Sequence, residues 1–226
     1  MATIYSGTND GQIRSVLNAS FAGTRAGTTG SSTEYGLSQG IVGQVFFSGR
    51  GGGTFGILRS FFEFDTSGIS VAPSAATLRL YGVNYNTADL IAVRSEQSAT
   101  LANGDLDALY GASTALGNSD GAGAGTLAGI SGLTYSAEIT SWATHAYNNV
   151  AFNATALADM ASLSLFKVAI LQYDNDYLDI TSVDAGGNAI SGAYFTETSG
   201  TSSDPYIDYT AGTAVTDNAV FFGANF

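Results

Sequence analysis

Three carboxylates lie close together in the segment DNDYLD, at Asp174, Asp176 and Asp179. An Asp-x-Asp spacing can bring oxygen ligands together around Ca²⁺, which prefers carboxylate and carbonyl oxygens. The segment has no glycine at the sixth loop position and no glutamate at the twelfth, so it is not an EF-hand. Two interpretations remain: a solvated turn, or a structural Ca²⁺ site formed by the three aspartates.

Residues that could catalyse hydrolysis are few. His145 is the only histidine, and no nucleophile elbow accompanies it. A glycosidase needs two carboxylates held about 5 to 10 Å apart in a cleft. The sequence alone gives no reason to place Glu63 at that distance from Glu138 or Glu197. Glu63 and Asp65 are better explained as strand-edge and corner residues, with Asp65 bonding turn amides. We therefore expect a non-enzymatic protein with no cofactor other than the Ca²⁺ considered above.

Aromatic rings are abundant, with 12 tyrosines and 13 phenylalanines. Outward-facing rings can stack on sugars, and Tyr81, Tyr85 and Tyr110 are the candidates for such a glycan-stacking role. A ring on a half-buried sheet also packs against its cross-strand neighbours. Stacking on a ligand and packing within the sheet therefore remain as two interpretations of these tyrosines.

Alternating apolar and polar residues predict the strands that must position these side chains. In segment 59–64, Phe62 and Phe64 share one face of a strand and Arg59 lies on the other. A second strand alternates over 76–81 beyond Pro73. Further strands are predicted over 11–16, 40–49, 89–96, 135–139, 163–174, 177–184 and 205–212.

The segments between these strands are predicted as loops and two short helical pieces. Residues 22–38 and 97–132 are rich in Gly, Ala, Ser, Thr and Asn, which favours a loop and a long surface excursion. Thr140 is a suitable N-cap for a short helix over 141–147, which would insert Trp142 into the core. The segment NATALADMAS (153–162) is the second candidate for a helical turn.

Short strands separated by turn signals indicate the fold class. There is no fixed-period repeat and no strand–helix alternation, which disfavours a parallel doubly wound sheet. We predict an all-β, antiparallel β-sandwich of the jelly-roll type with one or two short helices. The 226 residues suit a single domain over 1–210, followed by a C-terminal tail over 211–226.

The charge balance excludes several classes of partner. The chain has 7 basic and 19 acidic residues, which gives a formal net charge of −12. A nucleic-acid surface needs a basic stripe, and an anionic membrane surface also attracts basic segments. The chain has no cysteine, so disulfides and thiolate metal sites are excluded. The N-terminus lacks the apolar core of a secretory signal, and no run is long enough to cross a bilayer.

The C-terminal tail carries three aromatic residues, Phe221, Phe222 and Phe226. Exposed apolar surface of this kind marks contact sites. The tail can pack back on its own domain, or it can dock on a neighbouring subunit. The second interpretation predicts a homo-oligomer.

Three ordered motifs, "ILRSFFEFDTSGISVAPSAATLRLYG", "AEITSWATHAY" and "YFTETSGTSSDPYIDYT", resemble DNRLRE-type domains, which are carbohydrate-binding-module-like jelly rolls. The chain departs from the family pattern at 138–140, where Glu-Ile-Thr replaces Asp-Val-Thr, and in the long Gly/Ala insertion before it. The resemblance implies an antiparallel jelly roll of secreted polysaccharide-related proteins and virion appendages, without catalysis. The matching positions are Arg59, Phe64, Asp65, Ser67, Ala76, Leu78, Leu80, Tyr81, Ile139, Thr140, Trp142, Thr196, Glu197, Pro205, Ile207 and Tyr209.

Two functions follow as expectations. The first is a virion structural protein, from a bacteriophage, that serves as a capsid decoration, fibre or appendage component. Its partners would be other virion proteins, further copies of itself and host-surface glycan, with no nucleic acid and no membrane insertion. The second is an extracellular carbohydrate-binding module. The absence of cysteine, the low charge and the apolar tail favour the first.

Overall fold

Antiparallel strands dominate the computed structural model, which describes residues 1–35, 39–50, 52–112, 126–180, 188–196 and 202–214. The fold is an all-β sandwich, as predicted. The described strands are β1 (Ala2–Tyr5), β2 (Gly11–Ser15), β3 (Gly30–Tyr35), β4 (Gln39–Gly49), β5 (Gly52–Asp65), β6 (Ala75–Asn86), β7 (Leu90–Arg94), β8 (Tyr147–Ala151), β9 (Leu165–Gln172), β10 (Ala189–Tyr194) and β11 (Tyr206–Thr210). The helices are α1 (Phe21–Arg25) and α2 (Ala154–Ser162), with short turns at Asn103–Asp105, Leu127–Gly129 and Tyr173–Tyr177.

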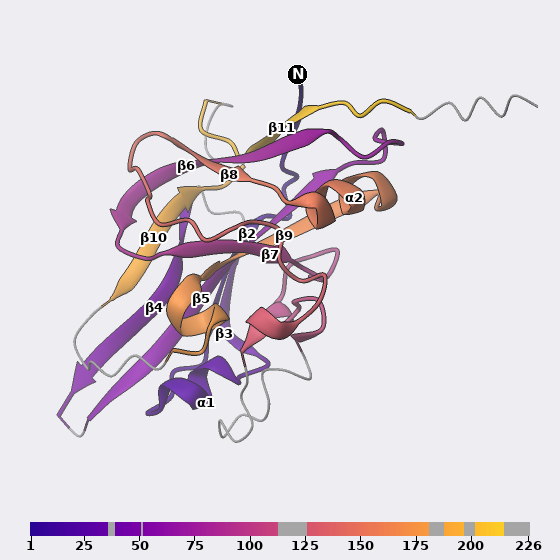
Figure 1. Cartoon of the computed structure of the whole chain (residues 1–226). Coiled ribbons are helices and arrows are strands. Elements are labelled where there is room, and N and C mark those ends of the chain that lie inside the picture. Colours follow the sequence, from indigo (N-terminus) through magenta and orange to yellow (C-terminus); the bar gives the residue numbers. More distant parts are fainter. Residues whose placement is uncertain (36–38, 51, 113–125, 181–187, 197–201, 215–226) are drawn as a thin grey trace, which may run out of the picture.

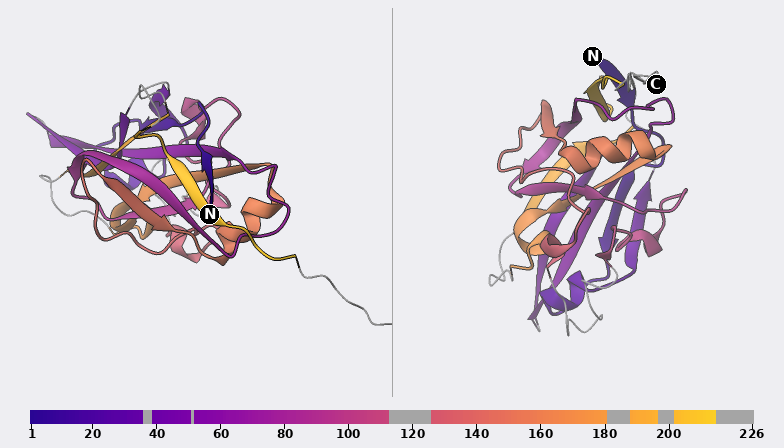
Figure 2. Two further views of the ribbon diagram at one scale, coloured as in Figure 1. Left: turned by 90° about the horizontal axis from the view of Figure 1, so that it is seen from above. Right: turned by 45° about the vertical axis from the view of Figure 1, so that its right-hand side comes forward.

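The strands form two layers that share one long strand. The first layer has the order β1-β11-β6-β8, and the second contains β10, β4, β5, β2 and β3, with β9 and β7 continuing from β5. Figure 1 shows β6, β8 and β11 together along one side of the molecule, and Figure 2 gives two further directions of view. The β4–β5 hairpin projects from the body in both figures.

Strand β6 passes from one layer to the other near Gly82. Its first part, 75–81, pairs with β11 and β8, and its second part pairs with β10. A side chain at Gly82 would place its Cβ 2.0 Å from the Ala143 carbonyl oxygen. Glycine is therefore required where the strand changes partners, because only a residue without Cβ allows this approach.

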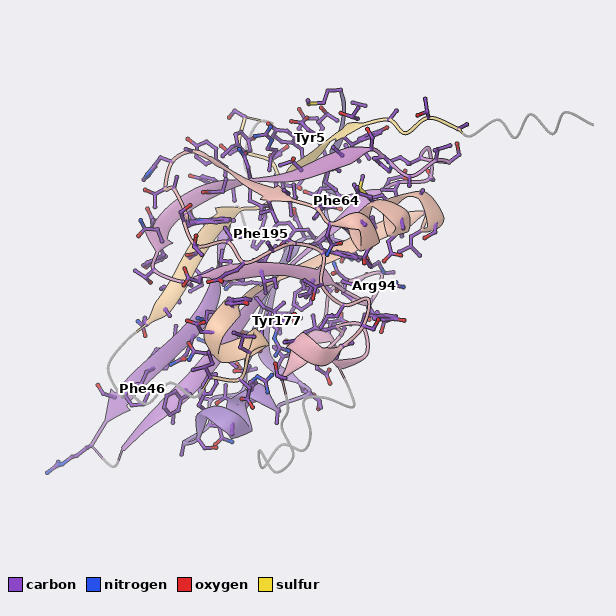
Figure 3. All side chains as sticks on the ribbon, viewed as in Figure 1. Tyr5, Phe46, Phe64, Arg94, Tyr177 and Phe195 are labelled. Atoms are coloured by element: carbon purple, nitrogen blue, oxygen red, sulfur yellow. The ribbon has the colours of Figure 1, made fainter. Side chains whose placement is uncertain are left out.

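The interior between the layers is built from alternating residues of both. Leu78, Leu80 and Val150 come from the first layer, and they meet Phe62 and Phe64 of β5. All five side chains are at most 1% exposed. The predicted division of the 59–64 segment into two faces is confirmed, and Asp65 accepts hydrogen bonds from the Ser67 amide and hydroxyl. Figure 3 marks Phe64 in this interior and Phe46 on the projecting hairpin.

The second face of β5 is also buried, which the sequence did not predict. Phe61 lies there with Ile13 and Leu171 in a separate apolar cluster. This cluster is covered by the segment that was predicted as a surface excursion. Leu106 and Leu127 of that segment are fully buried in the cluster. The described parts of 97–132 are therefore a second core layer, because the apolar back of this sheet needs a cover.

The predicted helix over 141–147 is wrong. Residues 141–143 are irregular, and Tyr147 already begins strand β8. Trp142 is nevertheless buried in the core, as predicted, and its indole Nε1 donates to the Gly192 carbonyl at 2.9 Å. The second helical prediction is confirmed by α2, whose N-cap Asn153 accepts a hydrogen bond from the Ala156 amide.

Other local predictions need correction. The predicted 22–38 loop contains the end of α1 and strand β3, and β1, β8 and β10 were not predicted. Segment 135–139 makes isolated bridges instead of a strand. The predicted strand over 177–184 is not seen in its described part, which begins with Tyr177 at the end of a π-helical turn. The remaining strand predictions correspond to β2, β4, β5, β6, β7, β9 and β11.

Candidate functional site

A row of five tyrosines crosses the outer face of the first layer and ends on β10 of the second layer. Ring centroids of consecutive members lie 5.7 Å apart for Tyr5–Tyr206, 5.0 Å for Tyr206–Tyr147, 5.2 Å for Tyr147–Tyr81 and 5.6 Å for Tyr81–Tyr194. The two outer contacts are tilted and the two inner contacts, on either side of Tyr147, are edge-to-face, which is a favourable arrangement for adjacent aromatic rings. We call these residues the tyrosine row.

Five different strands contribute one ring each to the tyrosine row, namely β1, β11, β8, β6 and β10. The register places Tyr5 opposite Tyr206 and Tyr81 opposite Tyr147. Side chains alternate across a strand, so Leu80, which precedes Tyr81 in β6, faces the core. The row is thus a direct consequence of strand register.

Two hydroxyl groups of the row are fixed by backbone carbonyls. Tyr81 donates to the His145 carbonyl at 2.8 Å, and Tyr147 lies within hydrogen-bond distance of the carbonyls of Ser202 and Asp204, at 3.1 and 3.2 Å. Burial, followed by nearby tyrosines and Asp204, raises the pKa of Tyr147 to about 12. Tyr147 therefore stays neutral at physiological pH, and the hydrogen bonds orient both rings. Tyr5, at the end of the row, is 50% exposed, and Figure 3 labels it at the outer edge of the layer.

Polar side chains lie beside the row on the same face. Arg79 forms an ion pair with Asp208 at 3.3 Å and donates to the Asn149 side chain. Thr3 donates to the other carboxylate oxygen of Asp208 at 2.8 Å. The result is a flat face of rings, amide, hydroxyl and paired charges, which suits a ligand with both apolar faces and hydroxyl groups.

The three tyrosines proposed from the sequence lie in different surroundings. Tyr81 belongs to the tyrosine row. Tyr85 is 47% exposed near the end of β6, beside a hollow of about 210 Å³ lined also by Gln12 and Gln39. Tyr110 is covered by the Arg94 guanidinium, 4.2 Å from its ring centroid. Four row members were missed because their strands, or their pairing, could not be recognised from local pattern.

Two of the three aspartates of the DNDYLD segment pair with arginines, whereas the backbone carbonyl of Asp174 accepts from the Ile180 amide at 2.9 Å. Asp176 is buried, and its carboxylate accepts from Arg59 Nε at 2.7 Å and Nη2 at 2.6 Å. Arg25 donates from Nε to the Asp176 carbonyl at 2.7 Å, and its Nη1 lies 3.3 Å from Asp179. Burial lowers the pKa of Arg25, and the two carboxylates oppose that shift.

This geometry does not fit the predicted Ca²⁺ site at Asp174, Asp176 and Asp179. Two arginines already supply positive charge to Asp176 and Asp179. Within the described residues, no three acidic or histidine side chains form a group that could hold a metal ion. The spacing of the aspartates instead places one carboxylate in the interior to meet Arg59.

The residues considered for hydrolysis are dispersed. His145 is exposed and has a positive φ of 59°, and Glu63 lies 3.6 Å from the Lys167 ammonium. Glu138 lines a groove beside β8. Glu197 and the tail residues Phe221, Phe222 and Phe226 lie outside the described residues, so the docking of the tail stays a prediction.

Comparison with known proteins gives no relative: no family model matches the chain, and no curated protein matches it. The resemblance to DNRLRE-type domains therefore stays a prediction. Among the described residues, no helix is long and apolar enough to span a membrane.

Proposed function

We propose that this chain is a non-enzymatic virion structural protein, a bacteriophage capsid decoration, fibre or appendage component, that assembles as an oligomer and contacts host glycan through the tyrosine row. The observation that carries the proposal is the row itself, with five rings in continuous contact on one outer face. Sugar rings present apolar faces to aromatic side chains, and their hydroxyl groups pair with polar neighbours such as Asn149 and Thr3.

The charges of this face favour a neutral glycan. Arg79 is already engaged by Asp208 and Asn149, so it does not offer an unpaired cation to an acidic sugar. The net charge of −12 repels polyanionic chains in addition. A neutral polysaccharide or a neutral surface oligosaccharide is therefore the expected ligand class.

The test is binding of the purified chain to an array of neutral and acidic glycans, followed by titration of the best ligand. Tyr5→Ala and Tyr206→Ala should each weaken binding by about tenfold, equivalent to ~1.4 kcal/mol. Tyr85→Ala is the matched control, because it removes an exposed tyrosine outside the row and should leave affinity unchanged. The glycan proposal would be contradicted if no glycan on the array bound the chain, or if all three variants lost affinity equally.

The virion assignment is tested separately. Mass spectrometry of purified particles should detect the chain as a stoichiometric component, together with the other structural proteins. Absence from particles, with glycan binding retained, would favour the second candidate, an extracellular carbohydrate-binding module. The same tyrosine row supports that candidate, since the row explains glycan contact in either setting.

A further inference from the structure

A groove of about 420 Å³ runs between β8 and residues 136–141. It is closed at one end by a bridge between Ser136 and Phe152. At the other end, the Asn148 side chain accepts from the Ala143 amide at 2.7 Å and donates to its carbonyl at 2.9 Å. The groove is therefore an elongated opening between two backbone segments that meet at both ends.

The far wall of the groove belongs to the second layer. Ile139 exchanges two backbone hydrogen bonds with Leu90 of β7, at 2.8 and 3.1 Å. Segment 136–141 therefore pairs with β7 and leaves β8 without a neighbour along most of its length. The opening lies where the two layers of the sandwich separate.

Strand β8 presents a free edge to this groove. Among the described strands it pairs with β6 alone. Backbone bonds from Gly82 to Ala146 and from Phe152 to Ala76 show that even-numbered residues bond toward β6. Backbone N–H and C=O groups of 147, 149 and 151 therefore point into the groove, because bonding alternates along an antiparallel strand. Such an edge is a template for an added strand.

We propose that this groove receives the C-terminal segment of a second copy of the chain as an added β-strand. The segment over 215–226 has twelve residues, contains no Pro, Lys or Arg, and includes the strand-forming run Ala219–Phe222. Twelve extended residues reach about 40 Å, whereas the five residues of β8 span about 17 Å. The tail is thus long enough to fill the edge.

The path of the last described residues favours a second copy as the partner. Strand β11 lies on the opposite side of β6 from β8. Beyond it, Gly212 packs against Ala72, where an added Cβ would lie 2.0 Å from the Ala72 carbonyl oxygen. Figures 1 and 2 show residues 211–214 continuing beyond the end of β11 and away from the body. The described end of the chain therefore lies on the side of β6 away from the groove of its own copy.

The groove lining suits a peptide strand. Alternate side chains of an added strand would point inward over Ile139 and Val150, or outward beside Tyr147. The apolar residues Val220, Phe221 and Phe222 supply side chains for both directions. Ser136, Glu138, Thr140 and Ser141 make the rest of the lining polar, and so suit the peptide backbone. This inference rests on the oligomeric assembly in the proposed function.

The first experiment compares the full chain with a chain lacking 215–226 by light scattering. The full chain should self-associate and the shortened chain should be monomeric, with equal thermal melts confirming that both fold. A synthetic 215–226 peptide carrying a fluorophore should then bind the shortened chain. An unchanged oligomeric state, or no peptide binding, would overturn the proposal.

Two N-methylated peptides provide the matched control for strand pairing. One is methylated at the amides of Ala219 and Phe221, and the other at Val220 and Phe222. Only alternate amides of an added strand face β8, so one peptide should lose binding and the other should keep it. Equal binding of both would show a contact without strand pairing and contradict the proposal.

Because the chain has no cysteine, cross-linking can identify the partner. Ala151→Cys and Ala219→Cys chains, differently tagged and mixed with a short bismaleimide, should form a heterodimer. The control chain carries Thr100→Cys in place of Ala151→Cys. Thr100 is exposed and lies outside the groove, so this chain should give no cross-linked heterodimer.

A glycan that displaces the bound peptide would instead show that the groove binds sugar. Tyr5→Ala should leave peptide binding unchanged, so failure of the glycan proposal is distinguishable.

Discussion

Arg59 and Asp176 form a two-point ion pair in the interior, with 2.7 and 2.6 Å between donor and acceptor atoms. Both side chains are 1% exposed, and they are 117 residues apart in the sequence. Arg59 also donates from Nη1 to the Leu106 carbonyl at 2.6 Å. One arginine thus joins β5, the segment after β9 and the covering segment of the second core.

Removing one member of this pair should destabilise the fold strongly. Arg59→Met leaves the Asp176 carboxylate buried without its main partner, so we expect a loss of about 3–5 kcal/mol in the free energy of unfolding. Urea denaturation measures it. Lys167→Met, at the more exposed pair with Glu63, is the control and should cost about 1 kcal/mol or less. Similar losses in both variants would contradict the structural role given to Arg59.

The hydroxyl of Tyr147 should make stability sensitive to alkaline pH. The folded pKa of about 12 lies above the ordinary value of 10.0, so its stabilising contribution is complete below pH 10 and is lost as pH rises through 12. Tyr147→Phe should cost about 1 kcal/mol at neutral pH. It should also remove one late-titrating tyrosine from an ultraviolet absorbance titration. An unchanged titration would show that Tyr147 ionises normally.

Asp204 should make the stability of the fold depend on pH in the acidic range. Burial, and then the neighbouring Asp10, raises the pKa of Asp204 above 3.8. The protonated form is favoured in the folded state, so stability from this group falls as pH rises from 3.8 through the folded pKa. Asp204→Asn should therefore gain stability relative to the parent as pH increases from acid to neutral. Chemical denaturation at several pH values measures this difference, and a constant or reversed difference would refute it.

Trp142 reports on the core between the layers. Its indole donates to the Gly192 carbonyl, and both groups are buried. Trp142→Phe removes this buried hydrogen bond, so we expect a loss of about 1–3 kcal/mol in the free energy of unfolding. It is the only tryptophan, so the parent should show blue-shifted fluorescence that moves to the red on unfolding. Emission already at the position of a solvated indole would show that Trp142 is outside the core.

The sequence by itself determined the fold class and most of the longer strands. The alternation in 59–64 and 76–81 is local, and side chains of period two identify a strand wherever it pairs. The helical prediction over 153–162 is likewise local, and the structure shows that Asn153 caps the helix it precedes. These predictions depend on neighbours within a few residues.

The tertiary structure alone decided which residues meet. The tyrosine row depends on the register of five strands distributed from β1 to β11, and register is a long-range property. The Gly/Ala-rich covering segment is not predicted as core from the sequence, because its few leucines have no regular spacing. They are buried because the second layer has two apolar faces. Local periodicity predicts a strand, but pairing and burial decide what that strand can contact.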